Sequence, residues 1–462
     1  MPIATVNPAT GETVQTFAEI SEEEVERALA AAAAAFASYR LTTFDDRADW
    51  MRRAAEILDG EQDKVATMMT TEMGKTLAAA RQEVAKCASA CRYYADHAAD
   101  LLADEPGDAA AVGAGQAYVR YQPLGPVLAI MPWNFPLWQA MRFAVPALMA
   151  GNVGLLKHAS NVPQTALFLQ DLFATAGFPE GTFQTLLISS ARVEPILRDD
   201  RVMAATLTGS GPAGQSVAGI AGSEIKKVVL ELGGSDPFIV MPSADLDAAA
   251  RVAAFARCLN NGQSCIAAKR FIVHDAVYDE FAPKFAARMA GMAVGDPMLD
   301  STDVGPLASE QQRDDVEKLV ADAVARGAKV LCGGAAPDDP GFYYPPTVLA
   351  GITRDMRVHH EEVFGPVATL YRVGDIEEAI ELANGTEFGL GASAWTSDEG
   401  EWFRFIRDLA AGMVFVNGNV TSYPQLPFGG VKNSGHGREL SEHGIREFCN
   451  IKTAWIGDPV SR

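Results

Sequence analysis

Hydrophobic and polar positions follow different periods along this chain of 462 residues. From Ser21 to about Leu102, alanine-rich segments place apolar residues at helical spacing. The first of them begins with three consecutive glutamates, which complement the dipole at the start of a helix. We therefore predict that the N-terminal hundred residues are mainly helical.

After this region, short apolar runs alternate with helical stretches, which is typical of βαβ units around a mostly parallel sheet. Residues 117–131 are β-branched and apolar around a Pro-Leu-Gly-Pro turn, which predicts two extended segments. The strands predicted up to Asp236 are 127–131, 154–157, 183–188, 204–207 and 227–232. Those predicted between Pro237 and about Gly435 are 271–274, 329–331, 368–373 and 412–416. We predict an α/β fold of two such domains in tandem, followed by an edge strand at 448–456.

Composition and charge narrow the class of protein. With 48% apolar and 21% charged residues, the chain has the composition of a folded globular protein. Its 38 basic and 59 acidic residues give a net charge of −21, which disfavours binding to nucleic acid or to membrane surfaces. The N-terminal residues lack the features of a secretory signal, and six cysteines over this length do not resemble a disulfide framework. We expect a cytoplasmic protein.

Histidine and cysteine spacing gives no sign of a metal site. Cys87 and Cys91 are four residues apart on a predicted helix with no histidine close by in the sequence, whereas a zinc site needs about four ligands at characteristic spacings. The seven histidines form no such pattern either. We predict no metal.

Cys265 ends the polar segment 260–265 (NNGQSC). A thiol in a polar turn can ionise and act as a nucleophile, because the thiolate is the reactive form. The alternative is that Cys265 only packs in the interior, as free cysteines often do. The local sequence leaves both interpretations open.

Two further segments are candidates for binding or catalysis. Residues 209–214 fit the G-x-G-x-x-G pattern after a predicted strand, and Glu231 follows Gly209 by 22 residues, about where a ribose-binding carboxylate is expected. The alternative is that the turn begins a helix near a nucleotide while Glu231 has another task. Asn134 lies between two prolines and could hold an amide donor at a fixed point for an oxyanion, or belong to a rigid turn.

Taken together, the motifs resemble the aldehyde dehydrogenase superfamily, and the likeness spans nearly the whole chain. Within it, the chain is most similar to short bacterial succinate-semialdehyde dehydrogenases. The segments that carry the resemblance are, in order, 131–136 (MPWNFP), 155–160 (LLKHAS), 208–210 (TGS), 230–234 (LELGG), 262–265 (GQSC), 361–366 (EEVFGP) and 427–432 (PFGGVK).

The resemblance implies a catalytic role for three residues. The Cys265 thiolate would attack the aldehyde carbon, and the Asn134 amide with the backbone N–H of Cys265 would hold the resulting oxyanion. Glu231 matches the general base that activates water to hydrolyse the thioester. Relatives that pass the acyl group to coenzyme A typically lack this carboxylate, so a free acid is the expected product.

The resemblance also bears on the cofactor. NAD-preferring relatives carry a glutamate at the position of Ser160, where a carboxylate would repel a 2′-phosphate, and Lys157 adds attraction. We therefore expect NADP to be preferred and NAD to be accepted. The other residues that match cofactor contacts of the family are Trp133, Gly209, Ser210, Leu232, Glu362 and Phe364.

For the substrate, Arg142 and Ser422 match residues that bind the carboxylate of succinic semialdehyde in relatives. A buried carboxylate needs such a partner, although Arg142 could instead form a structural salt bridge. The alternatives are a dehydrogenase of another semialdehyde (glutarate semialdehyde) or of an uncharged aliphatic aldehyde, or a non-catalytic member of the superfamily.

The family fold implies two Rossmann-type domains and an oligomerisation hairpin. We expect a cofactor-binding domain at 1–103 and 124–233, a catalytic domain at 234–435, and oligomerisation elements at 104–123 and 436–462 with a tail strand at 449–458. Unpaired strand edges are liabilities unless a partner covers them. A homodimer or homotetramer is therefore expected.

Overall fold

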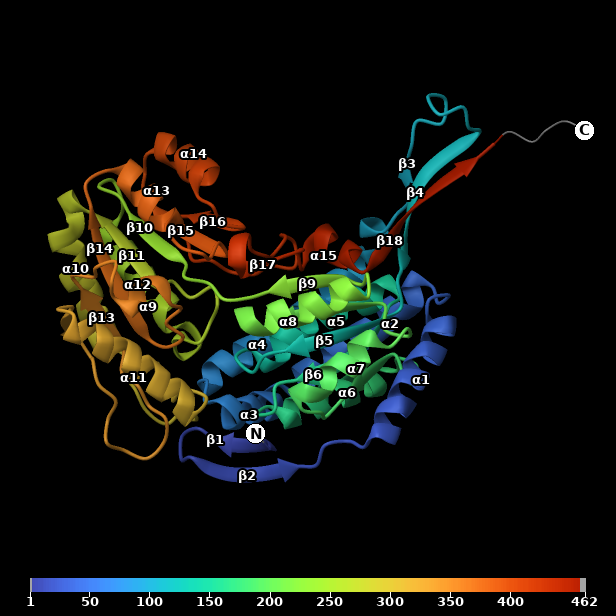
Figure 1. Ribbon diagram of the computed structural model, residues 1–462, viewed down its shortest axis with the longest axis horizontal. Helices are drawn as coiled ribbons and strands as arrows, with labels where there is room; N and C mark the ends of the chain where they lie inside the picture. The colour runs from blue at the N-terminus through green and yellow to red at the C-terminus, as the bar shows by residue number, and fades with distance from the viewer. Residues whose placement is uncertain (1, 458–462) are drawn as a thin grey trace, which may run out of the picture.

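The computed structural model describes residues 2–457. Two α/β bodies lie side by side, and a narrow three-stranded sheet projects from one of them (Figure 1). The α/β architecture with mostly parallel sheets that is expected from the sequence is confirmed. None of the helices within residues 2–457 is long and apolar enough to cross a bilayer.

The first body contains a six-stranded sheet in the order β17-β9-β8-β5-β6-β7. Its strands are β5 (Pro126–Met131), β6 (Val153–His158), β7 (Phe183–Thr185), β8 (Ala204–Thr208), β9 (Lys227–Glu231) and β17 (Gly435–His436). All neighbours are parallel except β17, which pairs antiparallel with β9. The chain passes from β5 outward to β7 and then returns to β8 on the other side of β5. This reversal of strand order creates a crevice at the carboxyl ends of β5 and β8, where nucleotides bind in open α/β sheets.

Helices cover both faces of this sheet. They are α1 (Glu22–Tyr39), α2 (Phe44–Gly60), α3 (Gln62–Met73), α4 (Leu77–Leu101), α5 (Pro136–Ala150), α6 (Pro163–Ala176), α7 (Val193–Arg198), α8 (Gly211–Ser223) and α15 (Ser441–Glu447), with the short 3₁₀ turns η1 (Ser190–Arg192) and η3 (Lys432–Ser434). Capping boxes at Ser21 and Thr43 satisfy free backbone N–H groups where α1 and α2 begin. The predicted helical region is thus confirmed from Glu22 to Leu101.

A hairpin precedes these helices and was not predicted. It consists of β1 (Ile3–Asn7) and β2 (Glu12–Phe17), joined through Gly11 at φ +76°. The side chain of Thr5 in β1 donates to the buried Glu72 of α3 at 3.0 Å. The prediction of a mainly helical N-terminal region is confirmed, and the hairpin adds two strands before its first helix.

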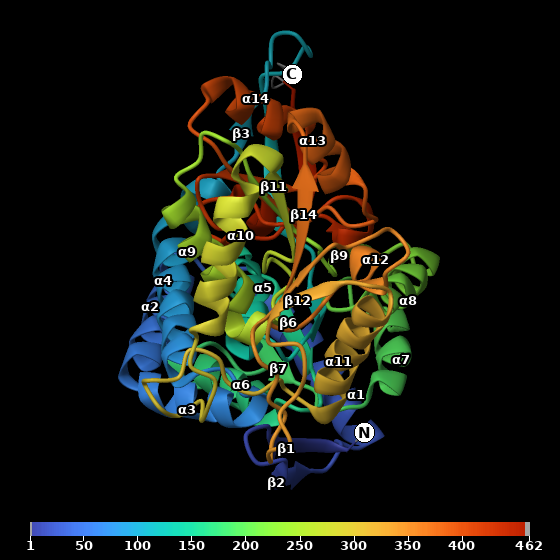
Figure 2. The ribbon, with the colours of Figure 1, turned by 90° about the vertical axis from the view of Figure 1, so that its left-hand side faces the viewer.

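The second body contains a seven-stranded sheet in the order β12-β13-β14-β11-β10-β15-β16. Its strands are β10 (Pro237–Val240), β11 (Arg270–His274), β12 (Lys329–Cys332), β13 (Thr347–Ala350), β14 (Val367–Val373), β15 (Gly391–Trp395) and β16 (Met413–Val416). Its helices are α9 (Leu246–Cys258), η2 (Leu259–Gly262), α10 (Asp275–Ala290), α11 (Glu310–Ala325), α12 (Arg357–His360), α13 (Ile376–Asn384) and α14 (Glu399–Asp408). Figure 2 shows α9 and α10 on one side of β11 and β14 and α13 on the other, so both faces are buried.

The projecting sheet joins the middle and the end of the chain. Its strands are β3 (Glu105–Pro106), β4 (Gln116–Pro123) and β18 (Cys449–Ile456), in the order β18-β4-β3. The exposed fractions of Ile451 and Trp455 in the edge strand β18 are 64% and 56%. The expected tail strand at 449–458 ends at Ile456, and residue 458, like Met1 and residues 459–462, lies outside the described part of the chain.

Candidate active site

Cys265 follows a short irregular loop that joins α9 to β11. Asn260 and Asn261 have left-handed backbone conformations, with φ angles of 56° and 59°, which asparagine tolerates better than most residues. A Cβ atom on Gly262 would lie 2.3 Å from the carbonyl carbon of Gly365, so only glycine fits there. The loop therefore requires its Asn-Asn-Gly sequence.

Side-chain amides hold this loop in place. Asn260 Nδ2 donates to the carbonyl of Asn134 at 2.7 Å, and Asn261 Nδ2 donates to the carbonyl of Gly74 at 2.8 Å. The Gln263 side chain accepts from the backbone N–H of Ala308 at 2.9 Å. These bonds tie the loop to three distant segments and fix the position of the Cys265 backbone.

The surroundings of Cys265 keep its sulfur protonated. The residue is half-buried, and desolvation raises the pKa of its thiol to about 12, although the charges of Arg142 and Lys269 act in the opposite direction. Lys269 Nζ donates to the carbonyls of Ser264 and Cys265 at 2.8 and 2.7 Å. The local sequence leaves open whether this thiol ionises or packs in the interior. The fold desolvates it, so its proton must be removed during attack.

Asn134 lies beside this loop, between β5 and α5. Its buried side chain donates through Nδ2 to the carbonyl of Gln263 at 3.1 Å. Because a primary amide has two N–H donors, one of them stays available for another acceptor. The structure thus brings the Asn134 amide next to the segment that carries Cys265.

Glu231 ends β9 and is buried. Burial raises the pKa of its carboxyl well above the ordinary value, and the nearby charge of Glu439 raises it further, while Arg142 lowers it. The charge of Glu231 also raises the pKa of the Cys265 thiol. Its oxygen Oε1 lies 2.8 Å from where a Cβ atom on Gly429 would be, so glycine at this position leaves room for the carboxyl.

The cofactor candidates gather at the carboxyl ends of the parallel strands in the first body. Trp133 follows β5, Lys157 is the penultimate residue of β6 with Ser160 just beyond, Gly209 and Ser210 follow β8, and Leu232 follows β9. Because these strands are parallel neighbours, their ends form one edge of the sheet. From the second body, Phe364 contacts Trp133 edge to face with ring centroids 5.7 Å apart, and Glu362 pairs with Lys269 at 3.1 Å.

This edge fits a phosphorylated dinucleotide. Ser210 precedes α8 and its side chain makes no capping hydrogen bond, so the start of this 13-residue helix can receive an anion. Lys157 is half-buried, and burial lowers the pKa of its ammonium. Burial disfavours the charged form of Lys157, and the negative charge of a nearby phosphate would favour that form again.

The G-x-G-x-x-G pattern at 209–214 also lies at this edge, after β8 and at the start of α8. In the standard arrangement it would follow the first strand of the unit, which here is β5. Glu231 instead lies close enough to Cys265 and Arg142 for the charges of these groups to affect one another's pKa values. The arrangement favours the alternative that the turn begins a helix near a nucleotide while Glu231 has another task.

His158 is the last residue of β6. Its Nε2 lies 2.8 Å from the carbonyl of Pro136, and burial lowers the pKa of the imidazole to about 4. The ring is therefore neutral at physiological pH and links the end of β6 to the start of α5.

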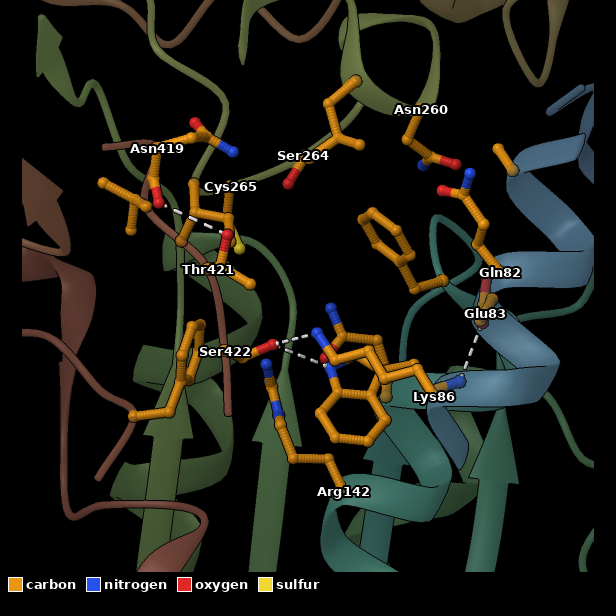
Figure 3. A pocket seen from close by; sticks show the side chains of 18 of the residues that line it. Gln82, Glu83, Lys86, Arg142, Asn260, Ser264, Cys265, Asn419, Thr421 and Ser422 are labelled. Carbon is orange, nitrogen blue, oxygen red and sulfur yellow. Dashed lines mark hydrogen bonds between the residues drawn. The ribbon is translucent and has the colours of Figure 1, made fainter. Parts of the chain in front are cut away.

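A cavity of about 220 Å³ leads to Cys265 (Figure 3). Apolar side chains form most of its wall, namely Phe135, Trp138, Phe255, Leu259, Ile266, Val420 and Phe428. Arg142 from α5 and the buried Ser422 both line it, as expected. Arg142 also forms a buried ion pair with Glu439, so the salt bridge considered for it exists as well.

Sequence reasoning missed three charged residues of the site. Lys86 of α4 lines the cavity and donates through Nζ to Ser422 Oγ at 2.6 Å. Lys269 supports the Cys265 loop, and Glu439 pairs with Arg142. Lys86 and Glu439 lie in no recognisable motif, whereas Lys269, four residues after Cys265, could have been suspected from its place before an apolar strand.

Comparison with known proteins agrees with this geometry. The profile of the Aldehyde dehydrogenase family matches residues 1–454. Succinate-semialdehyde dehydrogenase (NADP+) 1 of Mycobacterium tuberculosis is 66% identical over 456 residues, which is 99% of this chain and 100% of the relative. Succinate-semialdehyde dehydrogenase (NADP+) of Mycobacterium avium is 64% identical over 100% of this chain and 98% of the relative.

Solved structures show the same similarity. The crystal structure of succinic semialdehyde dehydrogenase from Streptococcus pyogenes, in complex with NADP+ as the cofactor, superposes with a TM-score of 0.96. Its sequence is 39% identical, and the match covers 99% of this chain and 100% of that chain.

Proposed function

The chain belongs to the aldehyde dehydrogenase family, and from this premise we propose that it oxidises succinic semialdehyde to succinate with NADP+. The observation that carries the proposal is the cavity that joins Cys265 to a cluster of cationic and hydroxyl groups from Lys86, Arg142 and Ser422. A four-carbon aldehyde with a distal carboxylate has a reacting end and a charged end, and the cavity offers a matching group to each.

The first step forms a bond between sulfur and carbon. Glu231 takes the proton of the Cys265 thiol, and the sulfur attacks the aldehyde carbon. The carbonyl oxygen becomes an oxyanion that accepts hydrogen bonds from the Asn134 amide and from the backbone N–H of Cys265. Burial raises the pKa of the Cys265 thiol, so a base that takes its proton would favour the attack.

The second step releases the acid. The bound cofactor would supply the hydride acceptor, and loss of hydride from the substrate carbon would leave a thioester on Cys265. Glu231 first releases to solvent the proton that it took from the thiol. It then takes a proton from water, the hydroxide adds to the thioester carbon, and the carbon–sulfur bond breaks to give succinate and the free thiol. A buried carboxyl with a raised pKa suits this role, because such a group gains a proton more readily than an exposed one.

We propose NADP as the preferred cofactor, with NAD also accepted. Support comes from Ser160, which adds no negative charge near the ribose position, and from the half-buried Lys157. The NADP+ held by the Streptococcus pyogenes relative is consistent with this assignment. Trp133, Leu232, Glu362 and Phe364 would flank the nicotinamide half, with Gly209 and Ser210 near the phosphates.

We also propose a cytoplasmic homodimer or homotetramer. The apolar side chains of Ile451 and Trp455 are exposed on the edge strand β18. Such an edge favours association when a second copy covers it. Light scattering on the purified protein tests this, because a monomer in solution would overturn it.

Steady-state kinetics test the activity. We expect kcat/KM to be highest for succinic semialdehyde with NADP+, lower for glutaric semialdehyde, and at least about 100-fold lower for butanal, which lacks the carboxylate. A higher value for glutaric semialdehyde would favour the alternative substrate. A protein that reduces neither NADP+ nor NAD+ with any of these aldehydes would be the non-catalytic member considered above.

The cofactor preference has its own test. The variant Ser160→Glu places a carboxylate where NAD-preferring relatives have one, and we expect it to lower kcat/KM for NADP+ by about 30-fold. Its kcat/KM for NAD+ should stay within about threefold of the wild-type value. Equal losses with both cofactors would contradict the proposed role of Ser160.

A further inference from the structure

Two of the charged side chains that line the cavity belong to buried ion pairs. Glu83 lines the cavity, but its carboxylate forms a buried ion pair with Lys75 and accepts from the backbone N–H groups of Leu137 and Trp138 at 2.9 and 2.7 Å. Arg142 is likewise paired with Glu439, and the side chains of both are almost completely buried. Each pair is neutral overall, so neither gives the cavity a net charge.

Lys86 is different. Within residues 2–457 it forms no salt bridge, and its Nζ donates to Ser422 Oγ and lies 4.4 Å from the centre of the Trp138 ring. Ser422 Oγ also accepts from Trp138 Nε1 at 3.1 Å, so its lone pairs are used by these two donors. Figure 3 shows the ends of the Lys86 and Arg142 side chains approaching Ser422, with all three below Cys265 in this view.

An unpaired cation in an apolar cavity is costly unless an anion joins it. Burial, together with the charge of Arg142, lowers the pKa of Lys86 to about 8. A carboxylate arriving at Nζ would favour the charged ammonium and replace the weak contact with the Trp138 ring. The cavity therefore lacks one negatively charged group beside Lys86.

We propose that Lys86 is a substrate-binding residue that selects aldehydes with a distal carboxylate, donating to that carboxylate together with Arg142 and Ser422. Lys86 supplies the net charge, whereas Arg142, already neutralised by Glu439, supplies directed N–H groups. This inference rests on the proposed oxidation of succinic semialdehyde and names the residue responsible for its specificity.

The test compares succinic semialdehyde with butanal, which has the same carbon chain and no charge. We expect Lys86→Met to lower kcat/KM for succinic semialdehyde by about 100-fold while the value for butanal stays within about threefold. Lys86→Arg, which keeps the charge, should retain the preference for succinic semialdehyde over butanal to within about tenfold. Lys64→Met, which removes an exposed charge from α3, is the matched control and should change neither value.

A second measurement does not depend on turnover of the charged substrate. Butyrate, a four-carbon carboxylate, should inhibit the wild-type enzyme in competition with succinic semialdehyde, and its inhibition constant measured with butanal as substrate should rise by at least about tenfold in Lys86→Met. A midpoint of thermal unfolding within a few degrees of the wild type would show that the variant is folded. Methionine keeps the apolar part of the lysine side chain, so we expect the variant Lys86→Met to fold.

The outcomes separate the two proposals. If the wild type prefers succinic semialdehyde and Lys86→Met keeps that preference, the assignment of Lys86 is wrong and the proposed function stands. If the wild type shows no preference for succinic semialdehyde over butanal, the proposed function itself fails and this inference fails with it.

Discussion

The two ends of the active-site cavity are built in different ways. At the reacting end, one loop of consecutive residues carries Cys265, and side-chain amides fix its backbone. At the recognition end, Lys86, Arg142 and Ser422 come from three segments that meet only in the folded chain. The reacting end contains a thiol and a carboxyl whose pKa values are raised by burial, whereas the recognition end contains an unpaired ammonium.

This difference separates chemistry from selection. A change at the reacting end should lower turnover for every aldehyde alike, because each aldehyde meets the same sulfur and the same base. A change at the recognition end should alter the choice among aldehydes and leave turnover of uncharged ones intact. The following predictions test that division, beginning with the largest effect.

Replacing the nucleophile should have the largest effect. We expect Cys265→Ser to lower kcat by about 10,000-fold for succinic semialdehyde and butanal alike, because a serine hydroxyl is a far weaker nucleophile than a thiolate. The measurement is NADPH formation followed by absorbance. Cys332→Ser, at a partly exposed thiol in β12, is the matched control and should behave as wild type. Substantial NADPH formation by Cys265→Ser would refute covalent catalysis by this sulfur.

Replacing the general base should lower turnover less than replacing the nucleophile does, and it should show which reaction step needs the base. We expect Glu231→Gln to reduce steady-state kcat by about 1,000-fold. If hydrolysis suffers more than attack, rapid mixing should still give a burst of NADPH that approaches one equivalent per subunit. Glu399→Gln, on the surface of α14, serves as the control. A variant without a burst would instead show that proton removal from Cys265 is the step that needs Glu231 most.

The same residue predicts a pH dependence. Burial raises the pKa of Glu231, so near neutral pH a sizeable fraction of the group is protonated and cannot accept a proton. Wild-type kcat should therefore rise as pH increases across the neutral range, and Glu231→Gln should lose this rise. A pH profile shared by both proteins would assign the titration to another group.

At the recognition end, the paired cation Arg142 and the unpaired cation Lys86 should contribute differently to the stability of the protein. Arg142→Met leaves the buried carboxylate of Glu439 without its partner and should reduce the free energy of unfolding by about 3 kcal/mol. Lys86→Met removes a charge that has no carboxylate partner within residues 2–457 and should reduce it by less than about 1 kcal/mol. Urea unfolding of both variants measures the difference, and equal losses would contradict the pairing described above.

The sequence predicted most of the fold because its strands are locally marked. Runs such as Lys227–Glu231 and Val367–Val373 are β-branched and apolar, and the structure has strands there. The strand Gly391–Trp395 was not predicted, because its Gly-Ala-Ser-Ala segment has no β-branched residue. It is a strand because β10 and β16 flank it in the sheet. Tertiary pairing decided what local propensity could not.

The residues of the site differ in the same way in how well the sequence predicts them. The loop from Asn260 to Cys265 and the turn at Asn134 are contiguous motifs, so the residues at the reacting end could be named from the sequence. Lys86 lies on an alanine-rich helix, 336 residues from Ser422, its hydrogen-bond partner. No local pattern marks a lysine as facing a cavity, so only the packing of α4 against α5 reveals it.

The smallest effect should come from the hydroxyl between the two recognition groups. Ser422→Ala removes one neutral O–H donor to the substrate carboxylate, so we expect KM for succinic semialdehyde to rise by about fivefold with kcat unchanged. Butanal kinetics should not change, because this substrate has no group to meet Ser422. Ser397→Ala, at an exposed serine after β15, is the control. If instead kcat fell equally for both aldehydes, Ser422 would act on the reacting end, and the separation of chemistry from selection would not hold for this cavity.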